Sequence, residues 1–467
     1  MSERKSEPVC TGACLFGKCP HKVCVRYLQK ERKAAQIKAD MNIFTGNLLP
    51  EIKPDKNGLG VAVDIGTTTL VAYLYDCGEA KQLAVASGIN SQAQFGVDVI
   101  SRIKYCSDFE RGLDILHEAL TRDVNSLIER LAGQHGADLN AIEHIVVTGN
   151  TTMLHLFAKI SPVSMGVLPF EPASLFGEFC SARELGLSAN RARVYLTPCM
   201  SSFVGGDITT AILASGLHRG GELCVLLDIG TNGEVVLGNS DFLLVTSTAA
   251  GPAFEGAHIR CGMAGVPGAI NSVYVYKGGV DFTTIGDAAP KGICGSGLLD
   301  AAALMVSAGL VDETGRIAGK DEIDENLWQY LIEAQGQPGV RIAPGIEITQ
   351  KDVREIQTAK AAIAAGLEAL LHHAGKSFDD VGKVFLAGGF GNFMDPKSAM
   401  KIGLLPKQFS GKIQPIGNAA GTGAIMALLN EGYKDECEKT AKTGRHVELG
   451  SNPVFMERYV DNMYFSA

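Results

Sequence analysis

The sequence predicts an α/β protein whose core is a duplicated, two-lobed domain. Apolar, β-branched runs alternate with amphipathic segments along the chain, which is typical of strands alternating with helices. In addition, Leu59–Asp76 (LGVAVDIGTTTLVAYLYD) and Leu223–Asn239 (LCVLLDIGTNGEVVLGN) share one pattern: an apolar run, Asp-Ile-Gly-Thr, and a second apolar run. Each segment is predicted to form a β-hairpin with Gly-Thr at its tip. Asp64 and Asp228 lie 164 residues apart, so the repeated unit has the size of a domain.

We expect three parts in the chain: a cysteine-containing head and linker over residues 1–57, a first lobe over 58–220 and a second lobe over 221–467. The linker prediction rests on Pro50–Gly58, a polar stretch with two prolines and a glycine, because these residues interrupt helices and strands. Strand-like sequence begins at Leu59.

Further elements follow from hydrophobic periodicity and from helix start signals. The last long helix is predicted to begin with a capping box, because Thr349 is followed three residues later by Asp352. The GNAAGTG sequence of residues 417–423 is predicted to open a final short helix. The helices are expected over residues 109–131, 351–374 and 424–429, and two further strands over 145–148 and 384–387.

The composition excludes several classes of protein. Of 467 residues, 46% are hydrophobic and 20% are charged, which is ordinary for a globular protein and unlike a disordered one. The net charge of −9 disfavours nucleic acid or an anionic membrane surface as the partner. No apolar run approaches the ~20 residues of a membrane span, and MSERKSEPVC lacks the apolar stretch of a signal peptide. We therefore expect a cytoplasmic protein with reduced cysteines.

The two Gly-Thr turns predict a phosphate site between the lobes. Backbone N–H groups and hydroxyls at a hairpin tip donate to phosphate oxygens, and an Asp beside the turn can hold hydrated Mg²⁺ between phosphates. The strand over 384–387 runs into a glycine-rich end suited to a nucleoside, and the chain has no P-loop motif. The expected nucleotide-binding residues are Gly66, Thr67, Thr68, Thr69, Gly230, Thr231, Asn232, Gly233, Gly388, Gly389, Phe390 and Asn392.

Five further residues have two interpretations each. Asp64 and Asp228 are candidates for holding metal-bound water, or else they cap their own turns. Glu255, in GPAFEGA, is a candidate for positioning the attacking water or a nucleoside hydroxyl, with a surface or hinge salt bridge as the alternative. Asp207 either holds Mg²⁺ through water or N-caps the following helix. Lys360 either reaches the nucleotide or is a solvated helical lysine.

Taken together, the hairpin pair and LAGGFGN resemble the actin, sugar-kinase and heat-shock-chaperone (ASKHA) ATPase superfamily. In that resemblance the motifs at 64–69 and 228–233 bind phosphates, and 386–392 binds adenosine. Longer blocks are similar to the ATP-dependent reductive activators of corrinoid proteins, over about residues 59–467. These blocks are TGNTTMLHL (148–156), FVGGDITTAILA (203–214), STAAGPAFEGAHIRCGM (247–263), GICGSGLLDA (292–301), ITQKDVREIQTAKAAI (348–363) and GNAAGTGA (417–424).

The resemblance implies a duplicated ribonuclease-H-like, two-lobed ATPase that binds ATP and Mg²⁺ and forms a homodimer. It also implies that the protein returns the cobalt of a partner corrinoid protein from Co(II) to Co(I). Asp64, Asp228 and Glu255 are then the expected catalytic residues.

Four cysteines crowd into the head: Cys10, Cys14, Cys19 and Cys24. Four thiolates are the usual ligand count of a [4Fe–4S] cluster and also of a structural zinc. Their spacing matches neither a common ferredoxin motif nor a zinc ribbon, so the cluster, zinc and a metal-free head all stay open. The corrinoid activators usually carry a ferredoxin domain at the N-terminus or a cluster domain at the C-terminus. The present head is too short for a ferredoxin domain, so any electron relay is expected on these four cysteines.

Two functions therefore compete. In the first, an iron–sulfur ATPase accepts an electron from a donor such as ferredoxin and passes it to a corrinoid or other low-potential metalloprotein. In the second, a non-redox ATPase of the same fold remodels or assembles a metalloenzyme, and its head holds a structural Zn²⁺. A small-molecule kinase is disfavoured because the longer blocks do not resemble those of sugar kinases.

Overall fold

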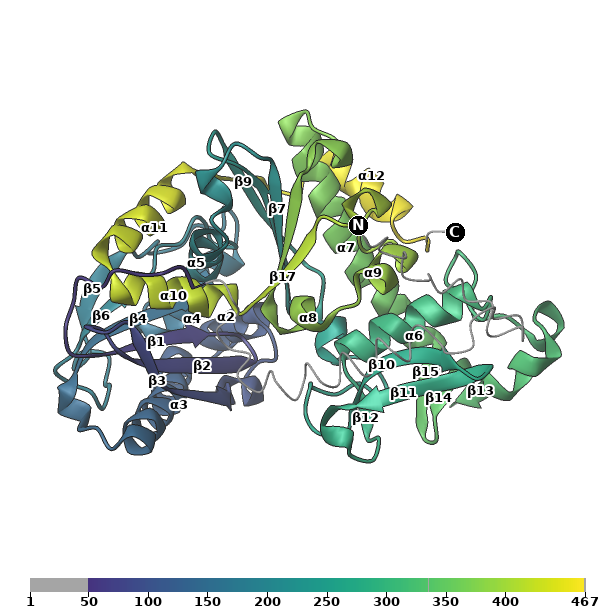
Figure 1. The fold of residues 1–467 in the computed structure, drawn as a ribbon, viewed down its shortest axis with the longest axis horizontal. Coiled ribbons are helices and arrows are strands. Elements are labelled where there is room, and N and C mark those ends of the chain that lie inside the picture. Colours follow the sequence, from purple (N-terminus) through teal and green to yellow (C-terminus); the bar gives the residue numbers. More distant parts are fainter. Residues whose placement is uncertain (1–48, 335, 466–467) are drawn as a thin grey trace, which may run out of the picture.

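A computed structural model describes residues 49–334 and 336–465. Its first sheet lies at the lower left of Figure 1 and has the order β3-β2-β1-β4-β6-β5. The strands are β1 (Leu59–Ile65), β2 (Thr69–Asp76), β3 (Lys81–Ile89), β4 (Ile142–Gly149), β5 (Glu178–Ser181) and β6 (Arg193–Leu196). β1, β2 and β3 pair antiparallel, whereas β1 pairs parallel with β4 and β4 with β6.

The second sheet, in the order β17-β16-β7-β8-β9-β18, repeats the arrangement of five strands of the first, β6-β4-β1-β2-β3. The sixth strands differ, because β5 lies beside β6 and β18 lies beside β9. Its strands are β7 (Cys224–Ile229), β8 (Gly233–Gly238), β9 (Leu243–Thr248), β16 (Lys383–Ala387), β17 (Ile413–Gly417) and β18 (Gly444–His446). Again three consecutive strands pair antiparallel, and the first of them pairs parallel with a strand that follows a long crossover. The predicted fold class, a duplicated ribonuclease-H-like two-lobed α/β fold, is confirmed.

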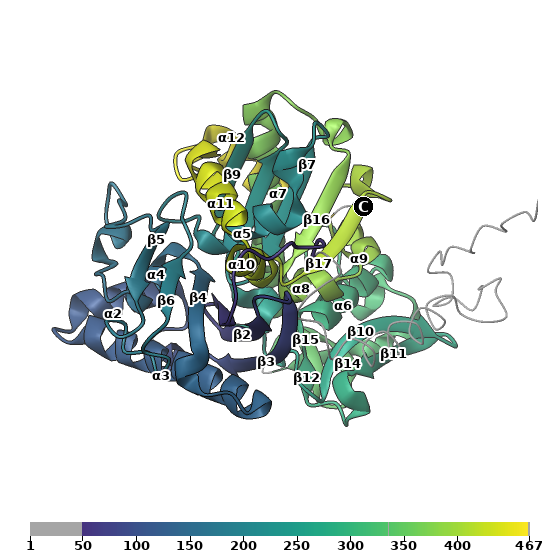
Figure 2. The same ribbon diagram turned by 60° about the vertical axis from the view of Figure 1, so that its left-hand side comes forward.

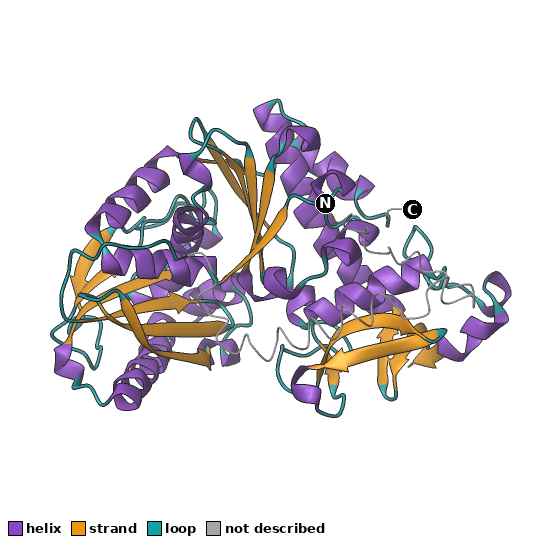
Figure 3. Cartoon of the chain, viewed as in Figure 1, coloured by secondary structure: helices purple, strands orange, loops and turns teal. Residues whose placement is uncertain are grey.

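Two small three-stranded sheets, which were not predicted from the sequence, lie at the lower right of Figures 1 and 3. One is β11-β10-β12 and the other is β13-β14-β15. Their strands are β10 (Ala269–Tyr276), β11 (Gly279–Thr284), β12 (Gly292–Ile293), β13 (Leu331–Ala334), β14 (Gln337–Ala343) and β15 (Ile346–Thr349). Helix α6 (Gly295–Ser307) packs on β10 and joins these strands to the core of the second sheet.

Helices cover both faces of each large sheet. Val61, Val63 and Ile65 of β1 pack with α3 (Gly112–His135) and α4 (Thr151–Phe157). The alternate residue Ala62 packs with α10 (Ala419–Leu429) on the other face, as the period of two in a strand requires. In the second sheet, odd-numbered β7 residues pack toward α7 (Gln350–Ala374), and Leu226 packs in the cluster of α5 (Gly206–Ser215).

Helices α5 and α10 therefore lie between the two large sheets, as Figure 2 shows. They approach closely because α10 carries Gly423 at the contact, where a Cβ would overlap the carbonyl of Thr210. Both helices are almost entirely buried. Among the described residues, no helix is long and apolar enough to cross a membrane.

Several predicted helices match the structure, and two are corrected. α7 begins with the predicted capping box, since Thr349 and Asp352 each accept from the other's backbone N–H. The helix expected over 109–131 is α3, which begins at Gly112 and continues to His135. Helix α2 (Val99–Asp108), which was not predicted, precedes it, and the two approach closely at Gly112, where a Cβ would overlap the carbonyl of Tyr105.

The helix expected over 424–429 begins earlier, at Ala419, because Asn418 caps it by accepting from Gly421 N–H. It is not the final helix either. α11 (Glu431–Thr443) and α12 (Pro453–Asp461) follow it, and α8 (Gly388–Phe393) and α9 (Pro396–Ile402) lie between β16 and β17.

The predicted linker, Pro50–Gly58, has almost no regular structure but is fixed to the C-terminal end of α10. Lys56 Nζ donates to the carbonyls of Ala427 and Leu428, at 3.5 and 3.1 Å. The backbone carbonyl of Lys53 accepts from Asn430, and Asp55 accepts from the N–H of Glu431. A cation at the last carbonyls of a helix is favourable, so this segment is a strap rather than a free linker.

Lys360 neither reaches the nucleotide nor lies in solvent, so both interpretations of this residue are wrong. It is fully buried in α7, and its Nζ donates to the carbonyls of Asn462 and Tyr464 at 2.5 and 2.6 Å. Gln357, one turn earlier, donates to the carbonyl of Met463. Burial lowers the pKa of Lys360 to about 8. Its function is to hold the C-terminal segment against α7.

We expect Lys360→Met to lower the free energy of unfolding by about 2–4 kcal/mol, because the carbonyls of Asn462 and Tyr464 lose a charged donor. ATP affinity should not change, because the lysine contacts only the C-terminal segment. Thermal unfolding with and without ATP checks both statements. Lys351→Met, on the exposed face of the same helix, is the matched control. A loss of ATP affinity in a folded Lys360→Met variant would contradict this assignment.

Candidate nucleotide site

The first Gly-Thr turn joins β1 to β2 and presents unused backbone donors. Gly66 N–H donates to Thr69 O at 3.0 Å, and a Cβ at Gly66 would come within 2.5 Å of that oxygen. Glycine is therefore required there. Within residues 49–334, the N–H groups of Thr67 and Thr68 donate to no protein acceptor. Thr68 and Thr69 are exposed, so this turn can bind an anion.

The second turn joins β7 to β8 in the same way. Gly230 N–H donates to Asn232 O at 2.9 Å, and the N–H groups of Thr231 and Asn232 have no protein acceptor within the same range. Gly233 differs in position from the other residues of this turn that were predicted to bind the nucleotide. It is buried in β8, where a Cβ would come within 2.7 Å of Ile363, so it fits the sheet and does not lie on the rim of the turn.

Glu255 connects the two turns. It ends the short 3₁₀ helix η7 (Pro252–Glu255), and its Oε2 accepts from Thr231 Oγ1 at 2.6 Å and from Thr68 Oγ1 at 3.4 Å. Burial raises the pKa of Glu255. Among the described residues it takes part in no salt bridge, so the alternative interpretation as a surface or hinge ion pair is wrong. One carboxylate thus contacts hydroxyls from both lobes.

The glycine-rich segment after β16 lies beside the second turn. It forms the short helix α8, and a Cβ at Gly388 would come within 2.5 Å of Asp228 Oδ1. Gly389 is exposed, with open space where a Cβ would stand. The ring of Phe390 stacks on Phe254 at 4.6 Å. Asn392, in the last turn of α8, is half-buried.

Half-buried carboxylates gather behind the two turns. Burial raises the pKa of Asp64 to about 6, although the amide of Asn418 donates to it at 2.9 Å. Burial, with the charges of Asp64 and Glu255, raises the pKa of Asp228 to about 7. Asp207 likewise has a pKa of about 7, through burial and then the charges of Asp228 and Asp64. These three acids therefore lie within electrostatic reach of one another.

Asp207 and one further acid, Glu234, correct the sequence analysis. Asp207 does not N-cap α5, because Gly205 is the N-cap and Asp207 lies inside the first turn. Glu234 was missed: it follows the second turn on β8, accepts from Ser247 Oγ at 3.0 Å, and has a pKa well above its ordinary value through burial and the charges of Asp207 and Asp228. An acidic residue inside an apolar strand was the available signal.

Magnesium fits this set of donors through water. Within the described residues, no three His, Cys, Asp or Glu side chains are close enough to ligate one ion directly. Mg²⁺ usually keeps several waters and one or two carboxylates in phosphate sites, and Asp64, Asp207 and Asp228 can accept from such waters. Cys10, Cys14, Cys19 and Cys24 lie outside the described residues.

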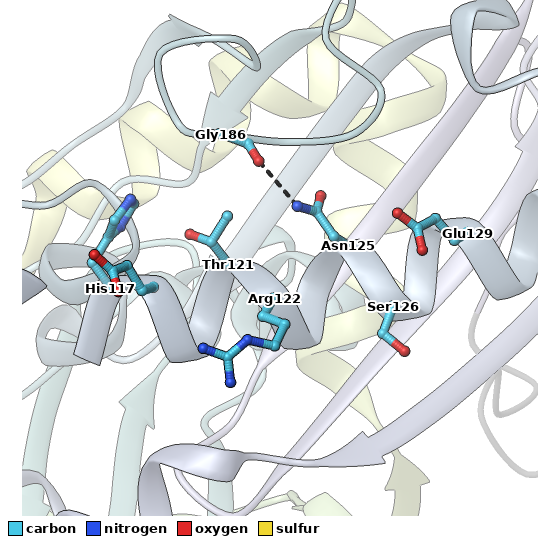
Figure 4. Close-up of a pocket in the computed structure, with 8 residues that line it drawn as sticks. His117, Thr121, Arg122, Asn125, Ser126, Glu129 and Gly186 are labelled. Carbon is cyan, nitrogen blue, oxygen red and sulfur yellow. Dashed lines mark hydrogen bonds between the residues drawn. The ribbon is translucent and has the colours of Figure 1, made fainter. Parts of the chain in front are cut away.

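A shallow groove on the outer face of α3, of about 620 Å³, is separate from the two turns (Figure 4). It is lined by polar side chains of α3 and by the loop at Gly186, whose carbonyl accepts from Asn125 at 3.0 Å. No residue of either turn lines it.

The carboxylate cluster predicts a pH dependence of stability. Asp207 and Asp228 titrate near pH 7 in the folded chain and near 3.8 when unperturbed. Between these two pKa values the folded state keeps protons that the unfolded state releases, so the free energy of unfolding falls as the pH rises from about 4 to 7 and levels off above 7. We expect the metal-free protein to lose stability less steeply between pH 4 and 7 in Asp228→Asn than in the wild type, as measured by thermal unfolding. The exposed Asp435→Asn should follow the wild type, and parallel profiles for all three proteins would contradict the expectation.

Comparisons with known proteins place the chain in a family. Residues 59–220 match the model of the RACo middle region, and residues 222–467 match the model of the C-terminal domain of RACo, the ASKHA domain. A corrinoid activation enzyme, RamQ, of Eubacterium limosum is 36% identical over 441 residues, which are 91% of this chain and 74% of the relative. A [Co(II) methylated amine-specific corrinoid protein] reductase of Methanosarcina barkeri is 24% identical, over 86% of this chain and 76% of the relative.

A solved structure described as a reductive activator for corrinoid, iron-sulfur protein is also similar. It is 36% identical with a TM-score of 0.80, over 88% of this chain. The present chain spans 66% of that structure's length and about three quarters of the length of the two curated relatives. Two family models cover most of the chain and a solved relative shares its fold, so the chain belongs to the RACo family of ASKHA-domain proteins.

Proposed function

We propose that this protein is an ATP-dependent reductive activator, which transfers one low-potential electron to a corrinoid protein. The observation that carries the proposal is the pair of Gly-Thr turns, one from each sheet, whose hydroxyls meet at Glu255. A site divided between two lobes changes when a ligand fills it, because the ligand contacts both. Such a site suits a protein in which nucleotide binding changes the arrangement of the lobes and thereby acts on a partner protein.

ATP would bind with its phosphates at the unused N–H groups of Thr67, Thr68, Thr231 and Asn232. Asp64, Asp207 and Asp228 would hold Mg²⁺ through water, which also offsets their mutual repulsion. The open space at Gly389 suits the nucleoside.

Glu255 would have two functions in turn. In the nucleotide-free site its carboxylate accepts from Thr231 and Thr68. A phosphate oxygen at either turn competes for the same hydroxyls, so binding releases Glu255 from at least one of them. The released carboxylate, with its raised pKa, is suited to take a proton from the attacking water.

The electron would come from the head, residues 1–57, which precedes in sequence the two lobes over 58–220 and 221–467. Four cysteine thiolates are the donor set of a [4Fe–4S] cluster, and Cys10, Cys14, Cys19 and Cys24 provide it. A cluster bound there would supply the single electron that converts Co(II) to Co(I). An external donor such as ferredoxin would then reduce the cluster again. We propose that the active protein is a homodimer.

We expect Glu255→Gln to reduce ATP hydrolysis by about 10²–10⁴-fold, because the amide cannot take a proton. ATP affinity should be retained or increased, because a carboxylate charge next to the phosphates is removed. Phosphate release and calorimetric titration measure the two effects. The exposed Glu129→Gln is the control, and unchanged hydrolysis in Glu255→Gln would exclude the base function.

We expect the anaerobically purified protein to contain about four irons and four sulfides per chain, because one [4Fe–4S] cluster has this content. With ATP and a low-potential donor it should convert a Co(II) corrinoid protein to Co(I), followed by absorbance. Cys14→Ser should lose both the iron and the cobalt reduction, whereas Cys106→Ser, outside the head, should lose neither. One zinc per chain and no cobalt reduction would instead support a non-redox ATPase that remodels or assembles a metalloenzyme.

A further inference from the structure

A buried arginine lies directly behind the first Gly-Thr turn. Arg102, on α2, has no exposed surface, and its guanidinium donates to three oxygen acceptors. Nη2 donates to Thr67 O at 2.6 Å, Nη1 to Gln92 Oε1 at 3.0 Å and Nε to Gly96 O at 2.9 Å. The fork geometry of the guanidinium thus ties the turn to two neighbouring segments.

All three acceptors are neutral. Among the residues that the structure describes, no carboxylate forms an ion pair with Arg102, and the nearby Asp98 uses its side chain to cap α2. Burial lowers the pKa of Arg102 to about 10, so the group stays charged at neutral pH. The charge of Asp98 favours the charged form of Arg102 without forming an ion pair with it. A buried charge with no directly bonded counter-charge is costly, and an anion nearby would offset that cost.

The backbone of the turn shows where that anion would lie. The three consecutive carbonyls of Gly66, Thr67 and Thr68 accept from Asn90 Nδ2, Arg102 Nη2 and Asn90 N–H, respectively. In a planar trans peptide, the N–H of the next residue points away from the carbonyl of the one before. The N–H groups of Thr67 and Thr68 therefore point away from Asn90 and Arg102, and these are the groups without a protein acceptor.

We propose that Arg102 is a positioning residue for the nucleotide phosphates. Its hydrogen bond to the Thr67 carbonyl orients the peptide between Thr67 and Thr68, so that the N–H of Thr68 points away from Arg102 and toward the phosphate site. The positive charge of Arg102 lies on the other side of this peptide and complements the negative charge of the phosphates. Arg102 itself contacts no phosphate. The inference rests on the proposed binding of ATP at the two turns, and it adds the residue that orients one of them.

The test compares Arg102→Met, Arg102→Lys and the wild type in binding to ATP, ADP and adenosine, followed by thermal-shift titration and calorimetry. We expect Arg102→Met to weaken ATP binding by roughly tenfold or more, the effect of losing one charge-assisted hydrogen bond. ADP should be affected similarly and adenosine should not. Arg102→Lys keeps the charge but loses the fork, so its loss should be smaller. Arg130→Met, an exposed arginine on α3 that donates to Ser87 O, should bind all three ligands like the wild type.

Unfolding without nucleotide shows whether each variant is folded, and if Arg102→Met is not, Arg102→Lys alone decides. Wild-type ATP affinity in a folded variant, or an equal loss for ATP and adenosine, would overturn the inference. Thr231→Val, in the second turn, separates this outcome from failure of the proposed function. If Thr231→Val loses ATP while the Arg102 variants do not, ATP binding at the turns stands and only the function of Arg102 is excluded. If the wild type does not bind ATP, the proposed function fails first.

Discussion

The close packing of α5 on α10 sets the distance between the two lobes, and the site depends on it. Each helix belongs to the core of a large sheet, and the two meet where Gly423 allows the Thr210 carbonyl to approach. A larger side chain at this point would separate the sheets. Because the hairpins that carry Asp64 and Asp228 belong to these two sheets, a change in the separation of the sheets would also change the distance between Asp64 and Asp228 and the contacts of Glu255 with both turns.

The same packing brings like charges together. Asp64, Asp207 and Asp228 each have a raised pKa, so the folded chain holds protons there that water would remove. A fold selected for stability alone would avoid this arrangement, because buried carboxylates are unfavourable without partners. On the opposite side of the first turn, Arg102 is a buried cation without an ion-pair partner. The turn thus lies between buried carboxylates on one side and a buried guanidinium on the other. In a bound magnesium nucleotide, Mg²⁺ would offset the charge of the carboxylates and the phosphates would offset the charge of Arg102.

Local features of the sequence were predicted well and long-range contacts were not. The two hairpins, α7 and its Thr349–Asp352 capping box depend on neighbouring residues, so the pattern of the sequence was sufficient. Glu255 was recognised as a candidate, but its contacts with Thr68 and Thr231 depend on how two separate lobes meet.

The residues that were missed or misassigned share one property. Arg102 and Lys360 are basic side chains that are fully buried, and Glu234 is an acid within an apolar strand, whereas hydrophobic periodicity places ionisable residues at the surface. Lys360 binds carbonyls about a hundred residues away. Only the tertiary structure shows such partners.

Helix α10 connects the nucleotide site to the strap at residues 50–58. At one end of the helix, Asn418 donates to Asp64 in the nucleotide site, and at the other, Lys56 holds the carbonyls of Ala427 and Leu428. Eleven residues make a stiff rod of roughly 16 Å. A tilt of about 4° at the Asp64 end would therefore move the far end by about 1 Å, at the same helix end to which the chain leading from residues 1–48 is fastened. Any tilt of α10 that accompanied occupation of the site would therefore displace that attachment point.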